Sequence, residues 1–235
     1  MGEPSGGISL RGALTSRTLA AAGFLHGFTV RREAEGDAPP RELALDDVFT
    51  VSQVHGSEVA IARGKPASMR DEKADAIILS RGLTGAVRVA DCVPVLVGDC
   101  VTGRAAAIHA GWRGIVAGVI PAALAHLRGK PGDMVGAVGP CIEACCFEVG
   151  DEVADPIEGA VPAPGVVVRR AGGKAWVDLA TAARAQLAAC GVGSTHIERV
   201  GACTRCDAER FYSFRRDGAH AGRMFGVITA HQPHA

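Results

Sequence analysis

Short apolar runs, each closed by glycine, proline or another turn residue, limit most strongly the folds open to this chain. Runs of this length that are rich in β-branched residues are typical of buried strands. Strands are predicted over residues 23–30, 48–55, 74–79, 87–97, 104–109, 134–138, 166–168, 196–200, 211–214 and 223–229. Because these strands do not alternate regularly with helices, we expect an α+β fold rather than a doubly wound parallel sheet.

Two segments have the apolar spacing of helices. Residues 114–127 form one such segment, which Pro121 is expected to kink or divide. Asp178 predicts the N-cap of a second helix over residues 179–189, closed near Gly191. The polar run at residues 33–40 predicts a loop. Without a repeat or a clear linker, we expect a partly ordered N-terminal segment, residues 1–22, followed by a single domain over residues 23–235.

Charge and targeting signals exclude several classes of partner. The 25 basic residues are balanced by 25 acidic ones, and no basic stripe is visible. Nucleic-acid binding draws most of its affinity from phosphate contacts, so we expect no nucleic-acid partner. The N-terminus MGEPSGG lacks the apolar region of a signal peptide, and no apolar stretch is long enough to cross a bilayer. We therefore expect a cytoplasmic enzyme that acts on small molecules and has no membrane partner.

Three short runs place a potential metal ligand at or near the end of a predicted strand. They are QVHG with His55, ADC with Cys92, and HAGWRG with His109. Two imidazoles and a thiolate suit Zn²⁺, and three protein ligands leave the fourth tetrahedral position open for chemistry. Each side chain could also have an ordinary role, as a surface or hydrogen-bonded histidine or as a small buried thiol. The long intervals between them fit ligands that converge from separate strands.

These runs also belong to a wider set of motifs in chain order: QVHG, ADCVPVL, HAGWRG, GP-x₅-CFEVG, CT and FYSFRRDG…GRM. Together they make the chain, from about Gly23 to Thr229, resemble the bacterial laccase-domain family. Members of that family are also described as multicopper polyphenol oxidases, purine nucleoside phosphorylases and peptidoglycan editing factors.

The resemblance implies both a fold and an activity. The fold is a four-layer α/β/β/α sandwich with two mixed β-sheets. The site is a catalytic zinc centre, carried here onto His55, Cys92 and His109. The substrates are purine nucleosides and phosphate: phosphorolysis of adenosine, inosine, guanosine and methylthioadenosine, with deamination of adenosine.

The residue content argues against a four-copper centre and against a nucleotide cofactor. A blue multicopper oxidase needs about ten histidines, several in His-x-His pairs, whereas this chain has eight histidines and no such pair. A four-copper centre is therefore not expected, although copper could occupy the zinc site. The sequence has no glycine-rich dinucleotide motif and no Walker motif, so no nucleotide cofactor is predicted.

Phosphorolysis requires an anion site, and Arg31 and Arg113 are the predicted phosphate-binding residues. Arg113 follows His109 at a turn into a helix, where backbone N–H groups favour anions. A salt bridge or a stack on Trp112 is equally compatible with the position of Arg113. Asp91 could orient a ligand histidine, but only if an irregular backbone brought it to the same face as its neighbour.

Functions besides that of a purine nucleoside enzyme stay open. Cys92 and His109 could form a metal-free hydrolase acting on peptidoglycan precursors. The same ligand group would also fit a polyphenol oxidase, or a metal-stabilised binding module without turnover. Five further cysteines are expected to be buried, although a second metal site or a redox-active pair is also conceivable: Cys141, Cys145, Cys146, Cys203 and Cys206.

Overall fold

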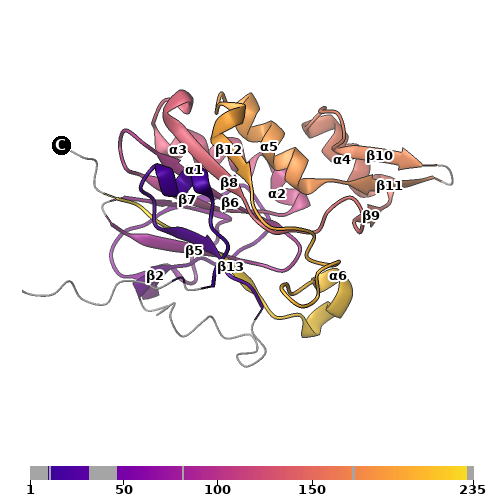
Figure 1. Ribbon diagram of the computed structural model, residues 1–235, viewed down its shortest axis with the longest axis horizontal. Helices are drawn as coiled ribbons and strands as arrows, with labels where there is room; N and C mark the ends of the chain where they lie inside the picture. Colours follow the sequence, from indigo (N-terminus) through magenta and orange to yellow (C-terminus); the bar gives the residue numbers. More distant parts are fainter. Residues whose placement is uncertain (1–9, 11, 32–46, 81, 171–172, 232–235) are drawn as a thin grey trace, which may run out of the picture.

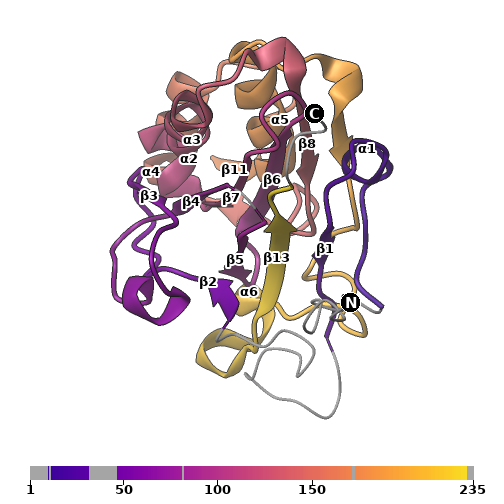
Figure 2. The ribbon, with the colours of Figure 1, turned by 90° about the vertical axis from the view of Figure 1, so that its left-hand side faces the viewer.

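Two mixed β-sheets stack face to face at the centre of the structure, a computed structural model that describes residues 10, 12–31, 47–80, 82–170 and 173–231 (Figures 1 and 2). The larger sheet has the order β12 (Ile197–Arg199), β8 (Met134–Val138), β6 (Val93–Asp99), β7 (Ala105–Ala110), β4 (Ala76–Leu79) and β3 (Val59–Ile61). The smaller has the order β1 (His26–Phe28), β13 (Met224–Thr229), β5 (Thr84–Val89) and β2 (Val48–Phe49). Parallel pairs occur in both sheets, at β12–β8 and β3–β4 in the larger and at β2–β5 in the smaller.

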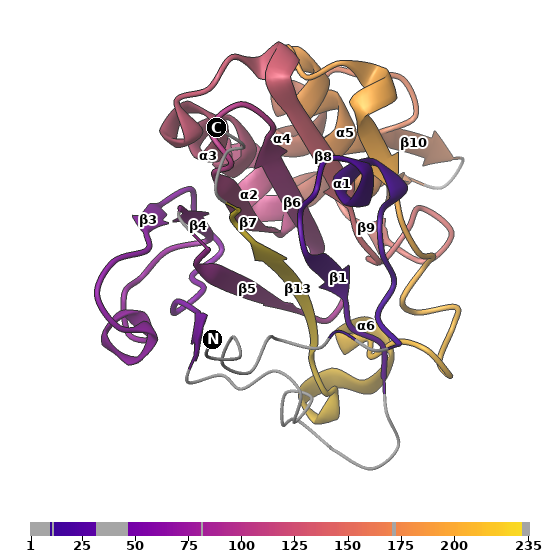
Figure 3. The same ribbon diagram turned by 60° about the vertical axis from the view of Figure 1, so that its left-hand side comes forward.

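The larger sheet is buried on both faces, which explains its almost continuous apolar strands. Side chains alternate between the faces of a strand. Leu96 of β6 therefore belongs to the core cluster that includes Phe28 and Ile228 of the smaller sheet, while Val95 belongs to the cluster that includes Ile120 of the helical layer. Figure 3 shows β5 and β13 lying in front of β6 and β7.

Helices cover the other face of the larger sheet (Figure 2). They are α2 (Trp112–Ala117), α3 (Val119–Leu127) and α5 (Leu179–Ala189), whereas α4 (Asp151–Ala160) packs on α2 and on the third sheet described below. Short elements lie outside this layer: α1 (Arg17–Ala21), α6 (Phe214–Asp217), and the 3₁₀ turns at Pro66–Met69, Pro131–Asp133, Ser194–His196 and Gly218–His220. A third, antiparallel sheet, in the order β10 (Val167–Arg170), β11 (Lys174–Val177) and β9 (Glu148–Val149), was not predicted.

The predicted helices are largely confirmed, with one displaced break. Asp178 caps α5 by accepting a hydrogen bond from the N–H of Thr181 at 2.8 Å. The segment at residues 114–127 is divided, but at Gly118, which has the left-handed φ of 80°. Pro121 lies in the first turn of α3, where a missing N–H removes no helical hydrogen bond.

Two predicted strands are wrong. The run at residues 87–97 is two strands in different sheets, separated by Ala90, Asp91 and Cys92, and Asp91 has a φ of 86°. Residues 211–214 do not form a strand, because the side chain of Ser213 caps α6 and turns the chain into a helix. The predicted loop at residues 33–40, together with residues 1–9 and 11 of the predicted N-terminal segment, lies outside the described residues.

The structure therefore confirms a mixed α and β domain containing two mixed sheets. A second outer helical layer, needed for the four-layer arrangement, stays a prediction. None of the helices within the described ranges is long and apolar enough to cross a membrane.

Candidate metal centre and its cavity

Three strand ends bring His55, Cys92 and His109 together. Cys92 immediately precedes β6, and His109 lies on the neighbouring β7, opposite Pro94. His55 follows β2 on the loop that leads to β3. One potential ligand atom from each residue lies within 4.8 Å of the others, and the two imidazole rings meet edge to face with centroids 4.8 Å apart. The predicted ligand residues thus share one place in the fold.

Asp75, which the sequence did not single out, orients this group. Its buried carboxylate accepts a hydrogen bond from Nδ1 of His109 at 2.8 Å, leaving Nε2 of His109 available to a metal. It also accepts hydrogen bonds from the backbone N–H groups of His55 at 2.9 Å and Gly56 at 2.7 Å. The only sequence signal was an aspartate inside the otherwise apolar run predicted as a strand at residues 74–79.

The backbone of His55 is strained, with a left-handed φ of 62°. A non-glycine residue adopts this conformation at a cost, and such conformations persist when surrounding contacts fix them. Asp75 supplies those contacts, because its carboxylate binds the N–H groups on both sides of the His55 α-carbon. These hydrogen bonds therefore hold His55, a candidate ligand, in its strained conformation.

Gly111 leaves room between the three candidate ligand residues. A β-carbon at this position would lie 3.1 Å from Sγ of Cys92 and 3.1 Å from Cδ2 of His55. Its backbone, with φ of −70°, is accessible to any residue, so space rather than conformation favours glycine here. Two nitrogens, one sulfur and this gap form a donor set that suits a tetrahedral zinc ion.

Charges within the group favour a thiolate and a protonated imidazole while the residues have no metal. Burial raises the pKa of the Cys92 thiol, but hydrogen bonds from His109 and His55 outweigh it and lower that pKa to about 6. Burial lowers the pKa of His109, yet Asp75 and the Cys92 thiolate raise it to about 9. The pKa of Asp75 is lowered, because His109 and backbone N–H groups overcome the opposing effect of burial. A deprotonated thiol at neutral pH is ready to bind a metal.

The carboxylate of Asp91 binds groups other than the two candidate ligand histidines, which corrects its proposed orienting role. Its carboxylate accepts hydrogen bonds from the hydroxyl groups of Thr204 at 2.6 Å and Ser213 at 3.1 Å, and from the N–H of Arg215 at 2.6 Å. The irregular backbone at Asp91 therefore serves to tie the Cys92 loop to the two segments that carry the CT and SFRR motifs.

A cavity of about 480 Å³ opens over the ligand group, within the range of ~300–1,000 Å³ usual for small-molecule sites. Aromatic side chains line one part of it: Trp112, Phe147 and Phe214. Arg88, Arg215 and Arg223 bring positive charge to its wall. The side chains that line it are thus of the types needed to stack a flat ring and to bind an anion.

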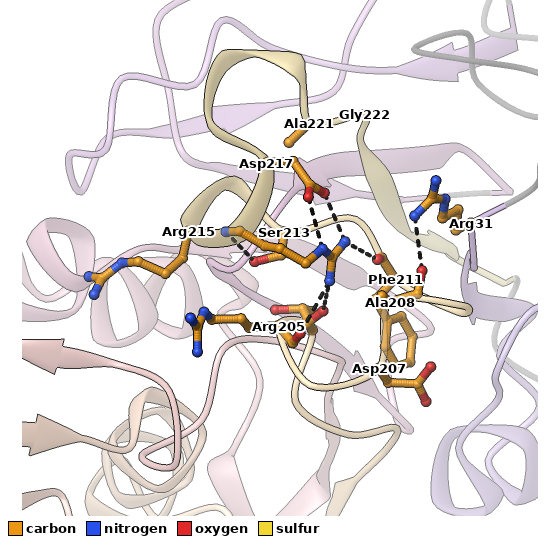
Figure 4. A network of polar contacts seen from close by, with 12 residues as sticks. Arg31, Arg205, Asp207, Ala208, Phe211, Ser213, Arg215, Asp217, Ala221 and Gly222 are labelled. Carbon is orange, nitrogen blue, oxygen red and sulfur yellow. Dashed lines mark hydrogen bonds and ion pairs between the residues drawn. The ribbon is translucent and has the colours of Figure 1, made fainter.

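Arg31 and Arg113 are not among the residues that line this cavity. Arg31 donates a hydrogen bond to the carbonyl of Ala208 at 3.0 Å, and Figure 4 shows its guanidinium directed toward that residue. Arg113 is exposed and stacks on Trp112 at 4.4 Å, as the sequence also allowed. Their roles in binding phosphate stay predictions.

Arg215 is better placed for an anion within the cavity. Its guanidinium lies 5.1 Å from the ring of Phe147 and donates one hydrogen bond to the carbonyl of Glu148 at 2.9 Å. A guanidinium has five N–H donors, so this contact fixes its direction without using up its capacity. In Figure 4 the Arg215 side chain extends away from Asp217, which lies on the same short helix, α6.

A second group of thiols lies outside the cavity and corrects an expectation of burial. Cys145 and Cys206 are exposed and Cys146 is half-buried, whereas Cys141 and Cys203 are buried. Within the described residues, two groups could hold a metal ion: the His55, Cys92 and His109 group, and a four-thiol group. The latter consists of Cys145, Cys146, Cys203 and Cys206.

Comparison with known proteins defines the class. The chain belongs to the family described as multi-copper polyphenol oxidoreductase laccase, whose model matches residues 31–231. Adenosine deaminase RL5, from an unknown prokaryotic organism, is 37% identical over 78% of this chain and 75% of its own length. A purine nucleoside phosphorylase of Streptomyces coelicolor is 38% identical over 83% of this chain and 81% of its own length. The resemblance seen in the sequence is thus confirmed.

Solved structures agree with this assignment. A protein of Neisseria meningitidis, 31% identical, superposes with a TM-score of 0.74 over 88% of this chain and 93% of its own. YlmD of Geobacillus stearothermophilus has a TM-score of 0.81 over 97% of this chain and 100% of its own. At 24% identity the second match supports the fold alone.

Proposed function

We propose that this protein is a zinc-dependent purine nucleoside enzyme that carries out phosphorolysis of purine nucleosides and deamination of adenosine. The observation that carries the proposal is the convergence of His55, Cys92 and His109 in the lining of a cavity that also contains aromatic and cationic side chains. Relatives named as purine nucleoside phosphorylase and adenosine deaminase support the substrate class.

The ligand group suits zinc better than a set of coppers. Its two imidazoles and one thiolate match the donors of catalytic zinc, and the space beside Gly111 leaves a fourth position open. Because copper binds most nitrogen and sulfur donors more tightly than zinc, copper could enter the same site. When bound, a zinc ion would supply Lewis acidity at neutral pH.

In phosphorolysis the chain's own residues bind and orient two substrates. Trp112 and Phe147 would hold the purine ring by stacking, while Arg215 would bind the phosphate dianion. A phosphate oxygen then attacks the anomeric carbon of ribose, the bond from that carbon to purine N9 breaks, and the released base takes a proton from water. Arg31 and Arg113 would act at the edge of this site rather than inside it.

Deamination uses the same cavity without phosphate. Water adds to C6 of adenine and ammonia leaves, which gives inosine. The apolar wall formed by Ile142 and Leu179 would limit the access of bulk water and strengthen the electrostatic contacts inside. We also propose that the complete domain has the four-layer α/β/β/α arrangement implied by its family.

Two assays test the proposal. Adenosine is incubated with zinc-loaded protein, with and without phosphate, and adenine and inosine are measured. Phosphate-dependent release of adenine and phosphate-independent formation of inosine are expected, and both should be lost in His109→Ala. His126→Ala, which changes an exposed histidine on α3, is the matched control. Turnover by His109→Ala equal to that of wild type would contradict the proposal.

The metal-free hydrolase is the second candidate, and Cys92 next to His109 is its basis. It does not explain why a second imidazole, that of His55, also approaches the thiol. Alkylation by iodoacetamide separates the two hypotheses. The zinc enzyme predicts that Cys92 is protected until a chelator is added, whereas the hydrolase predicts rapid alkylation with or without the chelator.

A further inference from the structure

Four cysteine thiols, one buried and three at least partly exposed, meet outside the ligand group already described. Cys145 and Cys146 come from the turn between β8 and β9, and Cys203 and Cys206 from the segment after β12. All four sulfur atoms lie within 4.8 Å of one another. Two chain segments far apart in the sequence therefore each contribute a close pair of thiols to one point.

The spacing of the sulfurs suits a tetrahedral metal ion. With zinc–sulfur bonds of about 2.3 Å, the sulfurs of a tetrahedral tetrathiolate lie roughly 3.8 Å apart. The sulfur of Cys206 lies 3.5 Å from that of Cys145 and 3.3 Å from that of Cys146, and the last two are 3.7 Å apart. A disulfide would need about 2.05 Å, so these sulfurs are spaced as ligands rather than as bonded pairs.

We propose that Cys145, Cys146, Cys203 and Cys206 bind a second zinc ion whose role is structural. Four thiolates complete the coordination of zinc and leave no open position for a substrate or water. The site is therefore distinct in kind from the three-ligand centre, and it stands whether or not the proposed nucleoside activity is correct.

Charge around the four thiols agrees with a bound cation and its thiolates. Zinc with four thiolates carries a net charge of −2, which needs nearby positive groups. The guanidinium of Arg205 lies 3.5 Å from the sulfur of Cys146. Arg216 donates hydrogen bonds to the carbonyls of Thr204 and Arg205, which fixes the loop that carries this charge.

The position of the four-thiol cluster shows which chain segments the proposed zinc ion would join. On one side, the N–H of Ile142, a cavity residue, donates a hydrogen bond to the carbonyl of Asp91 at 3.0 Å. On the other, the hydroxyl of Thr204, next to Cys203, donates to the carboxylate of Asp91 at 2.6 Å. Both segments thus contact the residue before Cys92. A zinc ion that joins these segments would stabilise the cavity wall and the loop that carries Cys92.

Metal content of freshly purified protein, prepared with a thiol reductant and supplied with zinc, tests the proposal. Wild type is expected to hold two zinc ions per chain, and Cys206→Ser one. His109→Ala should also hold one, and the double variant none. Cys100→Ser, which removes an exposed thiol elsewhere, is the control and should retain two. Equal zinc content in wild type and Cys206→Ser would overturn the proposal.

A second measurement tests the four-thiol site without relying on the Cys206→Ser variant. Cobalt is bound to His109→Ala, and the near-ultraviolet charge-transfer absorption of thiolate to cobalt is recorded. An intense band that is lost in His109→Ala with Cys145→Ser supports a tetrathiolate site. Absence of the band, or a disulfide between Cys203 and Cys206 in the native protein by mass spectrometry, would contradict it. Loss of nucleoside turnover in His109→Ala does not bear on either outcome.

Discussion

Asp75 and His109 are joined twice, once through their side chains and once through their backbones. The carboxylate accepts from Nδ1 of the imidazole at 2.8 Å, and the carbonyl of Asp75 accepts from the backbone N–H of His109 at 2.7 Å. The antiparallel pairing of β4 with β7 places the two residues side by side. The sheet register therefore sets the direction in which His109 presents its other nitrogen.

Replacing the carboxylate of Asp75 is expected to weaken metal binding, although the three candidate ligand residues all remain. Asp75→Asn keeps the shape but removes the charge that fixes the tautomer of His109, so zinc affinity should fall about 10- to 100-fold. Competition with a chromogenic chelator measures this. Asp99→Asn is the control, because Asp99 is equally buried but binds the turn at the far end of β6. Equal zinc affinity in Asp75→Asn and wild type would contradict the role given to Asp75.

Filling the space at Gly111 should block the metal directly. In Gly111→Ala the new methyl group would lie about 3.1 Å from a ligand sulfur and a ligand ring, so zinc content should fall well below one equivalent at this centre. Gly159→Ala is the control: its β-carbon meets nothing within 4 Å, and in α4 it should stabilise the fold by roughly 0.5–1 kcal/mol. Normal zinc content and turnover in Gly111→Ala would contradict the proposal that the space beside Gly111 is needed for the metal.

Arg215 is expected to distinguish the two proposed reactions. Loss of a charge-assisted contact costs roughly 1.5–3 kcal/mol, so Arg215→Ala should raise the KM for phosphate at least about tenfold. Deamination of adenosine, which uses no phosphate, should change much less. Arg184→Ala, an exposed arginine on α5, is the control. Equal losses in both reactions would show that Arg215 supports the cavity rather than the phosphate.

Glu198 makes the docking of α1 depend on pH. Its carboxylate accepts hydrogen bonds from the hydroxyl of Ser16 at 2.7 Å and the N–H of Thr18 at 2.9 Å. Partial burial opposes the shift, but these bonds and Arg17 hold the pKa of Glu198 below its usual 4.5. The stabilisation is therefore complete above about pH 4.5 and is lost as the pH falls through the lower folded-state pKa.

Glu198→Gln should accordingly lower the free energy of unfolding by roughly 1–3 kcal/mol at pH 7. The difference from wild type should shrink as the pH falls below 4.5, because protonation removes the same charge from the wild type. Urea denaturation across this pH range measures it. A difference that is constant with pH would mean that the charge of Glu198 does not contribute.

The three candidate ligand residues could be proposed from the sequence because each stands in a short distinctive run that resembles a motif of the family. Asp75 could not, because its role depends on the register between β4 and β7, which no local pattern encodes. The strand break at Asp91 was missed for a similar reason. Asp91 adopts its φ of 86° because its carboxylate binds Thr204 and Ser213, more than 100 residues away in the chain. Tertiary contacts, rather than propensity, decided these features.

The four-thiol cluster could not be predicted from the sequence either. Cys145 and Cys146 are adjacent, and Cys203 and Cys206 are separated by two residues, but nothing in the sequence indicates that the two pairs meet. The parallel bridge between Cys141 and Cys203 brings them together. Likewise α4, which contains Pro156, and the short strands β9 and β11 have weak patterns and are stabilised by packing on one another.

Anomalous diffraction at the zinc edge from crystals of the zinc-loaded protein tests the central claim most directly. A peak bounded by His55, Cys92 and His109 is expected, with nitrogens at about 2.0–2.1 Å and sulfur at about 2.3 Å. Ordered electron density for all three side chains with no peak between them would contradict it.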